Sequence, residues 1–199
     1  KRQGLVLLKD KSYLIFFISA VLICIPLSFY YSFANVFLND LGMEGAAGKM
    51  AYGQISEAIF ILTIPFLYYR LGVKNILIIG IAAWALRFFF FANGDLEAYY
   101  WMIISGILLH GICYDFFFVT GYMYTENKAG EKIKNAAQGL FTVATYGIGM
   151  TIGSWFSGII TDSNTIEGIK NWGDIWMVPA YISGAVLLFL VVFFKEKNK

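Results

Sequence analysis

An acidic side chain lies in the middle of an apolar stretch: between Glu97 and Glu126, Asp115 is the only residue with a formal charge. A charged side chain at the centre of a membrane helix costs about 2.5–3.5 kcal/mol on insertion scales, so such a residue indicates a functional site by default. Because apolar surroundings disfavour the charged form of a carboxyl group, Asp115 could take up and release a proton. The alternative is a static hydrogen bond or ion pair that holds two helices together.

Two further pairs of polar residues have helical spacing. His110 and Tyr114 are four residues apart and Gln54 and Glu57 are three apart, so each pair shares one helix face. An amide and a carboxylate together suit a polar, uncharged ligand that is rich in hydroxyl and amide groups. In the structural alternative, Glu57 forms an ion pair with Arg87, which lies at a comparable depth in the next apolar segment.

Ser28, Tyr31 and Asn35 line one face of the first apolar segment at spacings of three and four. They could hydrogen-bond a ligand within a helix bundle, or they could link neighbouring helices. His110 is the only histidine, and it could likewise be a ligand contact or a hydrogen-bonded helix contact. Both interpretations stay open for all four residues.

The elements that position these side chains are predicted to be membrane-spanning helices. Of 199 residues, 59% are hydrophobic and 14% are charged, whereas soluble domains carry about 25% charged residues. A helix needs roughly 20 apolar residues to cross the hydrocarbon core. Six segments qualify: residues 12–39, 50–69, 75–94, 98–125, 135–161 and 175–194. Their short connections force neighbouring helices to run antiparallel, which predicts an all-α membrane protein with a six-helix bundle over residues 12–194.

Basic residues gather on one set of connections. This set holds Lys1, Arg2, Lys9, Lys11, Arg70, Lys74, Lys128, Lys132, Lys134, Lys195, Lys197 and Lys199. The opposite connections hold only Lys49 and Lys170. By the positive-inside rule, both ends of the chain are predicted to face the cytoplasm. Residues 1–11 then form the remnant of a cytoplasmic linker and residues 195–199 a cytoplasmic tail. We expect a fragment of a longer chain, because the sequence begins with Lys rather than Met.

Motifs for enzyme chemistry are missing from the sequence. It contains no HExxH, no clustered His, Cys and Asp set for a metal, and no glycine-rich phosphate loop. We therefore expect no enzyme, no metal, no cofactor other than a proton as coupling ion, and no nucleic-acid partner. Gly149 and Gly153 form a GxxxG motif, which predicts close helix packing, with a hinge as the minority interpretation.

Several motifs resemble a known family. The turn "PFLYYRLGVKN" resembles the loop signature of the major facilitator superfamily, with matches at Arg70, Gly72 and Lys74. The stretches "GQISE", "WALRFFFFANGD", "GICYDFFFVTGYMYTE" and "AQGLF" follow one another in an order and at spacings that resemble the C-terminal half of the nucleoside:proton symporter family. The resemblance covers nearly the whole chain. It implies a twelve-helix parent in which two six-helix halves, each built from 3+3 inverted repeats, rock about a central site.

The resemblance also implies roles for individual residues. Gln54 and Glu57 match the pair that contacts nucleoside in this family. Tyr114 and Asp115 match an aromatic–aspartate pair in which the aromatic ring contacts the ligand and the aspartate serves proton coupling.

The sequence departs from the family at four candidate site residues. The family often has Tyr where His110 stands and Phe where Tyr114 stands, and its first-span Gln and Asn map onto Ser28 and Tyr31. These departures bear on the choice between purine and pyrimidine nucleosides, or on the nucleoside itself.

We expect the C-terminal half of a proton-coupled nucleoside transporter that works by alternating access in a bacterial-type inner membrane. Its partners would be the lipid bilayer, a nucleoside or similar polar solute, and the missing N-terminal six-helix half. Two alternatives stay open. One is a major facilitator carrier for a sugar or another small polar solute, and the more distant one is a six-span structural subunit that does not transport.

Overall fold

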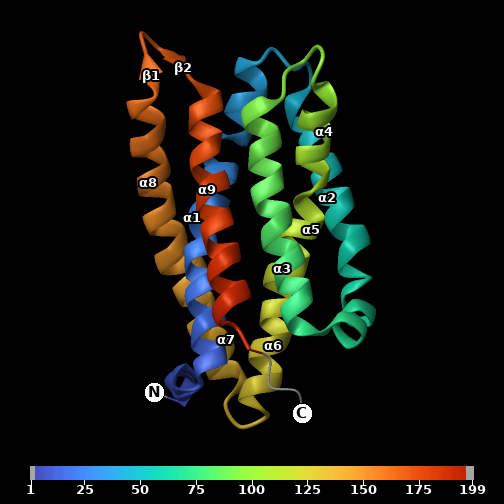
Figure 1. The fold of residues 1–199 in the computed structure, drawn as a ribbon, viewed down its shortest axis with the longest axis vertical. Helices are drawn as coiled ribbons and strands as arrows, with labels where there is room; N and C mark the ends of the chain where they lie inside the picture. Colours follow the sequence, from blue (N-terminus) through green and yellow to red (C-terminus); the bar gives the residue numbers. More distant parts are fainter. Residues whose placement is uncertain (1–2, 196–199) are drawn as a thin grey trace.

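Long helices run side by side along the whole length of the molecule (Figure 1). The computed structural model describes residues 3–195. The predicted linker is therefore described only from Gln3 onward, where residues Gln3–Lys9 form the 3₁₀ helix η1. Of the predicted basic tail only Lys195 is described, and Lys197 and Lys199 lie outside the described residues.

The first and last long helices begin at side-chain caps. Helix α1 (Lys11–Asp40) follows Asp10, whose carboxylate accepts a hydrogen bond from the backbone N–H of Tyr13. Helix α9 (Trp172–Phe193) follows Asn171, which caps its first turn in the same way. Such caps satisfy backbone donors that a helix leaves unpaired at its start. Helix α1 extends one residue beyond the predicted span at each end, because its apolar run is uninterrupted.

The second of the six predicted spans is not one continuous helix. The structure divides it between α2 (Ala46–Ile61) and the start of α3 (Ile64–Asn93). Helix α3 itself turns at Gly72, whose φ of 75° is a conformation that glycine adopts without steric cost. Within the described residues, five helical stretches are long and apolar enough to cross a membrane, and α2, with 16 residues, is too short by itself.

The fourth and fifth spans each contain a π-helical segment. The fourth span is built from α4 (Tyr100–Leu108), α5 (His110–Tyr114), η2 (Asp115–Val119) and α6 (Thr120–Ala129). The fifth is built from α7 (Lys134–Thr142), η3 (Val143–Gly149) and α8 (Met150–Ser163). Both η2 and η3 are π-helices, which occur frequently at functional sites. Asp115 is the first residue of η2.

Helix η1 and the C-terminal end of α9 lie at the same end of the bundle as the α6–α7 connection (Figure 1). The opposite end carries a two-stranded antiparallel hairpin of β1 (Thr165–Ile166) and β2 (Ile169–Lys170). The chain direction thus places the connections rich in basic residues and those that hold only Lys49 and Lys170 at opposite ends, as the alternation of antiparallel helices predicts.

An aromatic stack joins α3 to α9 in the core. The ring of Trp84 stacks on that of Phe88 at 5.7 Å between centroids, and Phe88 stacks on Trp176 at 5.7 Å. Phe91 contacts Trp176 at 5.3 Å. Large aromatic rings contribute much of the packing in such a core, and this stack fixes the face of α3 that carries Arg87.

Helices α1 and α8 approach closely where the GxxxG motif lies. A Cβ atom added to Gly153 would stand 2.5 Å from Ser28 Oγ and 2.9 Å from the carbonyl oxygen of Cys24. A Cβ atom on Gly149 would stand 2.8 Å from Cys24 Cβ. The two glycines therefore leave the room that the α1 backbone occupies, which is the close packing that the motif predicts.

We expect Gly153→Ala to destabilise the bundle, because the added methyl group would push α1 and α8 apart. Overpacking of this kind costs about 1–3 kcal/mol. Thermal unfolding of the detergent-solubilised full-length protein measures the effect. Gly158→Ala is the matched control on the same helix, since a Cβ atom there meets nothing within 4 Å. Equal melting temperatures for the two variants would contradict the close packing.

Candidate functional site

Helix α2 packs tightly against α5 through two glycines. A Cβ atom on Gly53 would lie 3.1 Å from His110 Cβ, and one on Gly111 would lie 2.5 Å from the carbonyl carbon of Ser56. The Ser56 hydroxyl donates a hydrogen bond of 2.6 Å to the carbonyl oxygen of Leu108. This contact brings Glu57, the next residue on α2, against the imidazole of His110.

Three polar side chains from three helices form a chain in the site. Nη1 of Arg87 on α3 lies 3.1 Å from Nδ1 of His110 on α5. Nε2 of His110 in turn lies 3.4 Å from Oε2 of Glu57 on α2. The described residues contain no direct ion pair between Arg87 and Glu57 within 4 Å, because the imidazole stands between the two charges. The sequence places Arg87 and Glu57 at a comparable depth, and the structure links the two side chains through His110.

Arg87 is fully buried. Its guanidinium carbon lies 3.4 Å from the ring centroid of Tyr30, 5.6 Å from that of Trp84 and 5.7 Å from that of Phe91. Within the part of the chain that the structure describes, its Nε and Nη2 atoms have no hydrogen-bond partner. Aromatic faces stabilise a cation through the ring quadrupole, so the rings take the place of a carboxylate and leave one directed hydrogen bond, to His110.

Aromatic rings enclose His110 and extend the site across three helices. The imidazole stacks on the rings of Tyr30 and Tyr114, with centroid distances of 5.2 and 5.9 Å. The Tyr114 hydroxyl forms a hydrogen bond with the hydroxyl of Tyr146 on η3. Tyr31 is 54% exposed beside Tyr30. Tyrosines from α1, α5 and η3 therefore lie next to the linked side chains of Arg87, His110 and Glu57.

Asp115 is fully buried at the start of η2. Neither of its carboxyl oxygens has a hydrogen-bond partner among the described residues. Burying an ionised carboxylate without a partner costs several kcal/mol. These surroundings therefore accommodate a protonated carboxyl group at lower cost than a carboxylate. No basic side chain within 4 Å holds Asp115 in an ion pair in the described chain.

The other predicted residues are separated by the structure. Ser28 is buried against α8, and its hydroxyl donates to the carbonyl oxygens of Cys24 and Met150. Asn35 is exposed and accepts hydrogen bonds from Asn39 through its carbonyl and side-chain oxygens.

Gln54 is exposed on α2, one turn before Glu57. Glu57, His110 and Tyr114 thus come together, with Arg87 behind them. Tyr30 and Tyr146 also belong to this cluster and were not predicted from sequence. The adjacent Tyr31 was the nearest signal for Tyr30, whereas Tyr146 lies among glycines without any polar pattern.

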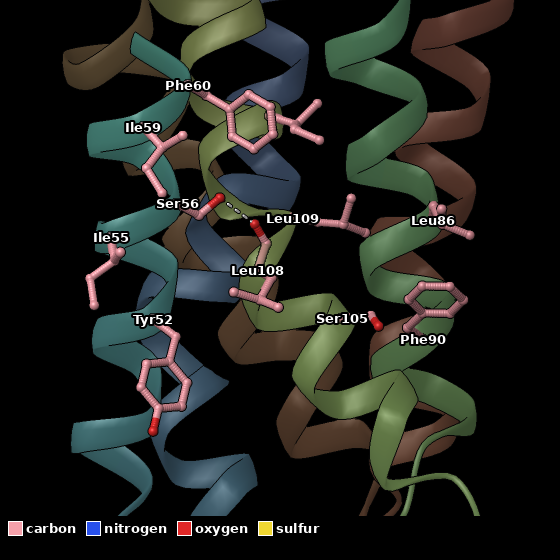
Figure 2. A pocket seen from close by; sticks show the side chains of 11 residues that line it. Tyr52, Ile55, Ser56, Ile59, Phe60, Leu86, Phe90, Ser105, Leu108 and Leu109 are labelled. Atoms are coloured by element: carbon pink, nitrogen blue, oxygen red, sulfur yellow. Dashed lines mark hydrogen bonds between the residues drawn. The ribbon is translucent and has the colours of Figure 1, made fainter. Parts of the chain in front are cut away.

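An apolar cavity of about 600 Å³ lies on a different face of α2 (Figure 2). Figure 2 shows Ile55 and Ile59 of α2 on one side of this cavity and Leu86 and Phe90 of α3 on the other. Ser56 and Leu108 lie between these two sides, joined by their hydrogen bond. The predicted polar residues do not line it, so the cavity is separate from the candidate site.

Secondary transporters are one class of membrane protein in which polar groups gather between membrane-spanning helices. Comparison with known proteins gives the family. The sequence model described as "Nucleoside H+ symporter" matches residues 1–199, and the chain belongs to this family.

Curated relatives carry transporter names. The putative nucleoside transporter YegT of Escherichia coli K12 is 38% identical over 98% of this chain and 48% of its own length. The nucleoside permease NupG of the same organism is 34% identical over 96% of this chain and 49% of its own length. The xanthosine permease of that organism is 32% identical over 96% and 48%. The chain spans about half the length of these relatives, which are transporters rather than enzymes.

Solved structures of NupG have the same fold. A mutant form superimposes with a TM-score of 0.90 at 32% identity, covering 96% of this chain and 50% of that one. A second NupG structure superimposes with a TM-score of 0.87 at 33% identity, covering 98% and 51%. The fold predicted from sequence, one half of a major facilitator transporter, is confirmed.

Proposed function

We propose that this chain is the C-terminal six-helix half of a proton-coupled nucleoside transporter. The observation that carries the proposal is the match of the whole chain to the nucleoside H+ symporter family. The chain covers about half of each relative, which agrees with a second bundle of similar size elsewhere in the parent protein. The two bundles would enclose the solute between them and expose it alternately to the two sides of the membrane.

The polar groups of the site suit a nucleoside. Glu57 is one-third exposed at its side chain, and Gln54 is exposed one helical turn away. A carboxylate accepts hydrogen bonds from ribose hydroxyls, and an amide both donates to and accepts from a base. Tyr31 and Tyr114 supply ring faces and hydroxyl groups at the same site, and aromatic rings stack readily on nucleobases.

Asp115 is proposed as the proton-coupling residue. Its buried carboxyl group has no polar partner in the described chain, so it is expected to be neutral in this conformation. A conformational change that admits water or a basic group would allow the proton to leave. Net transport of protons with the solute then follows from the alternation of the two environments, with no cofactor or metal beyond the proton.

The charge pattern sets the proposed orientation. Helix η1, the C-terminal end of α9 and the α6–α7 connection share one end of the bundle (Figure 1), and this end carries most of the basic residues of the described chain. By the positive-inside rule it faces the cytoplasm, in the inner membrane of a bacterium.

Uptake of labelled uridine by proteoliposomes tests the proposal. The liposomes contain the full-length transporter, and an imposed pH gradient, acidic outside, drives uptake. We expect accumulation that unlabelled nucleosides inhibit and that sugars do not. Inhibition by sugars alone would favour a sugar carrier, and absence of any solute flux would favour a structural subunit.

A further inference from the structure

The protonation state of His110 follows from its two neighbours. A guanidinium group only donates hydrogen bonds, so Nδ1 of His110, 3.1 Å from Arg87 Nη1, must accept. A neutral imidazole carries one proton, which is then on Nε2, and Nε2 lies 3.4 Å from Oε2 of Glu57. A proton on Nδ1 would set two donors against each other. We assign His110 as the neutral tautomer with its proton on Nε2.

We propose that His110 is a positioning residue that holds the Glu57 carboxylate for the solute and does not bind the solute itself. The proposal rests on the function proposed above, because it takes Glu57 as a nucleoside ligand. The His110 side chain is only 5% exposed, whereas that of Glu57 is 33% exposed. The imidazole also stacks on two rings, those of Tyr30 and Tyr114. It therefore offers the solute little surface, while Nε2, which carries the proton in this tautomer, lies 3.4 Å from the partly exposed Glu57 carboxylate.

Arg87 acts through the same chain. Its guanidinium is fully buried and cannot reach a solute, but its hydrogen bond to Nδ1 polarises the imidazole and fixes the ring orientation. Hydrogen bonds in such a chain strengthen one another in a low-dielectric interior. An imidazolium would lose the Arg87 bond and add a second buried positive charge beside the first. His110 is thus unsuited to carry protons, which is consistent with the proposal of Asp115 for that role.

Two variants of the full-length transporter separate positioning from solute contact. His110→Gln retains one acceptor and one donor, whereas His110→Phe retains a flat ring and loses both. Hydrogen bonds to charged groups contribute about 1.5–3 kcal/mol, so His110→Phe should raise KM for uridine about tenfold or more. The His110→Phe substitution leaves Asp115, the proposed proton-coupling residue, unchanged, so kcat should stay close to wild type. His110→Gln should restore most of the affinity that His110→Phe loses.

The double variant gives the sharper kinetic readout. If His110 acts only through Glu57, His110→Phe combined with Glu57→Gln should raise KM no further than Glu57→Gln alone. Additive effects, or a His110→Gln variant as impaired as His110→Phe, would show direct solute contact and overturn the proposal.

A spectroscopic test needs no solute. Nitrogen-15 spectra of histidine-labelled full-length protein, with the His110 signals identified by their loss in His110→Gln, should show a protonated Nε2 and an unprotonated Nδ1. A protonated Nδ1 would overturn the assignment even if all variants fold and transport. Conversely, a wild-type protein with this tautomer and no affinity for nucleoside would reject the proposed function while leaving the tautomer intact, so the two failures are distinguishable.

Discussion

Asp115→Asn should abolish uptake driven by a proton gradient while nucleoside exchange continues. The amide is isosteric with a protonated carboxyl group but cannot release a proton. Since Asp115 is fully buried without a hydrogen-bond partner among the described residues, replacing it by a neutral group should leave packing and solute binding largely unchanged. Proteoliposomes containing the full-length variant should show gradient-driven uptake no higher than liposomes without protein.

Counterflow measures the activity that should persist. Liposomes preloaded with unlabelled uridine should still exchange it for external labelled uridine, because exchange requires no net movement of protons. Asp162→Asn is the matched control, since Asp162 is an exposed aspartate near the end of α8. Uptake by Asp115→Asn that depends on pH as in the wild type would exclude Asp115 from proton coupling.

Glu57→Gln should weaken nucleoside binding much more than it lowers the amount of folded protein. Hydrogen bonds to a charged group contribute about 1.5–3 kcal/mol, which corresponds to a loss of affinity of about tenfold to a hundredfold. The side chain is partly exposed and its polar contact is the neutral imidazole of His110, so the neutral amide should be tolerated structurally. Isothermal titration calorimetry of the purified full-length transporter with uridine measures the affinity, and thermal unfolding measures the stability.

Glu44→Gln serves as the control for removal of one negative charge, because Glu44 is exposed in the connection between α1 and α2. A Glu57→Gln variant that no longer folds, beside a normal Glu44→Gln variant, would identify the Arg87–His110–Glu57 chain as a structural link between helices.

Much of the fold is readable from sequence because the spans are long and their connections are short. The uninterrupted apolar run before Asn39 predicts α1 to within one residue at each end. The break between α2 and α3 was missed, because residues 50–69 carry a single formal charge, Glu57, and hide a change of direction at Leu62 and Thr63. Composition measures whether a segment can enter lipid, and says little about where its axis bends.

Some residues of the candidate site, such as Glu57, His110 and Tyr114, were predictable from sequence, but their arrangement was not. Spacing along one helix places His110 with Tyr114, yet it does not determine how α3 and α5 are rotated toward each other. For this reason the sequence suggested a direct pair of Arg87 with Glu57 and missed the imidazole between them. The π-helices η2 and η3 add to the difficulty, because each shifts the helical register of the residues that follow it.

Ser28 illustrates a different limit. It has the spacing to share a face with Tyr31 and Asn35. Because Gly153 on α8 has no side chain, however, Ser28 packs against α8 and donates a hydrogen bond to the carbonyl oxygen of Met150. The spacing of residues within α1 could not predict this contact, because the contact depends on Gly153, which lies on another helix.

The burial of Arg87 also bears on how the chain is inserted into the membrane. An arginine at the centre of a helix costs about 2.5–3.5 kcal/mol on insertion scales, and Arg87 has its two closest stabilising contacts on other spans: the ring of Tyr30 on α1 and the imidazole of His110 on α5. During synthesis, α3 emerges before His110. The third span is therefore fully stabilised only after the fourth has been inserted. A nascent chain that ends soon after Asn93 carries an arginine without its hydrogen-bond acceptor.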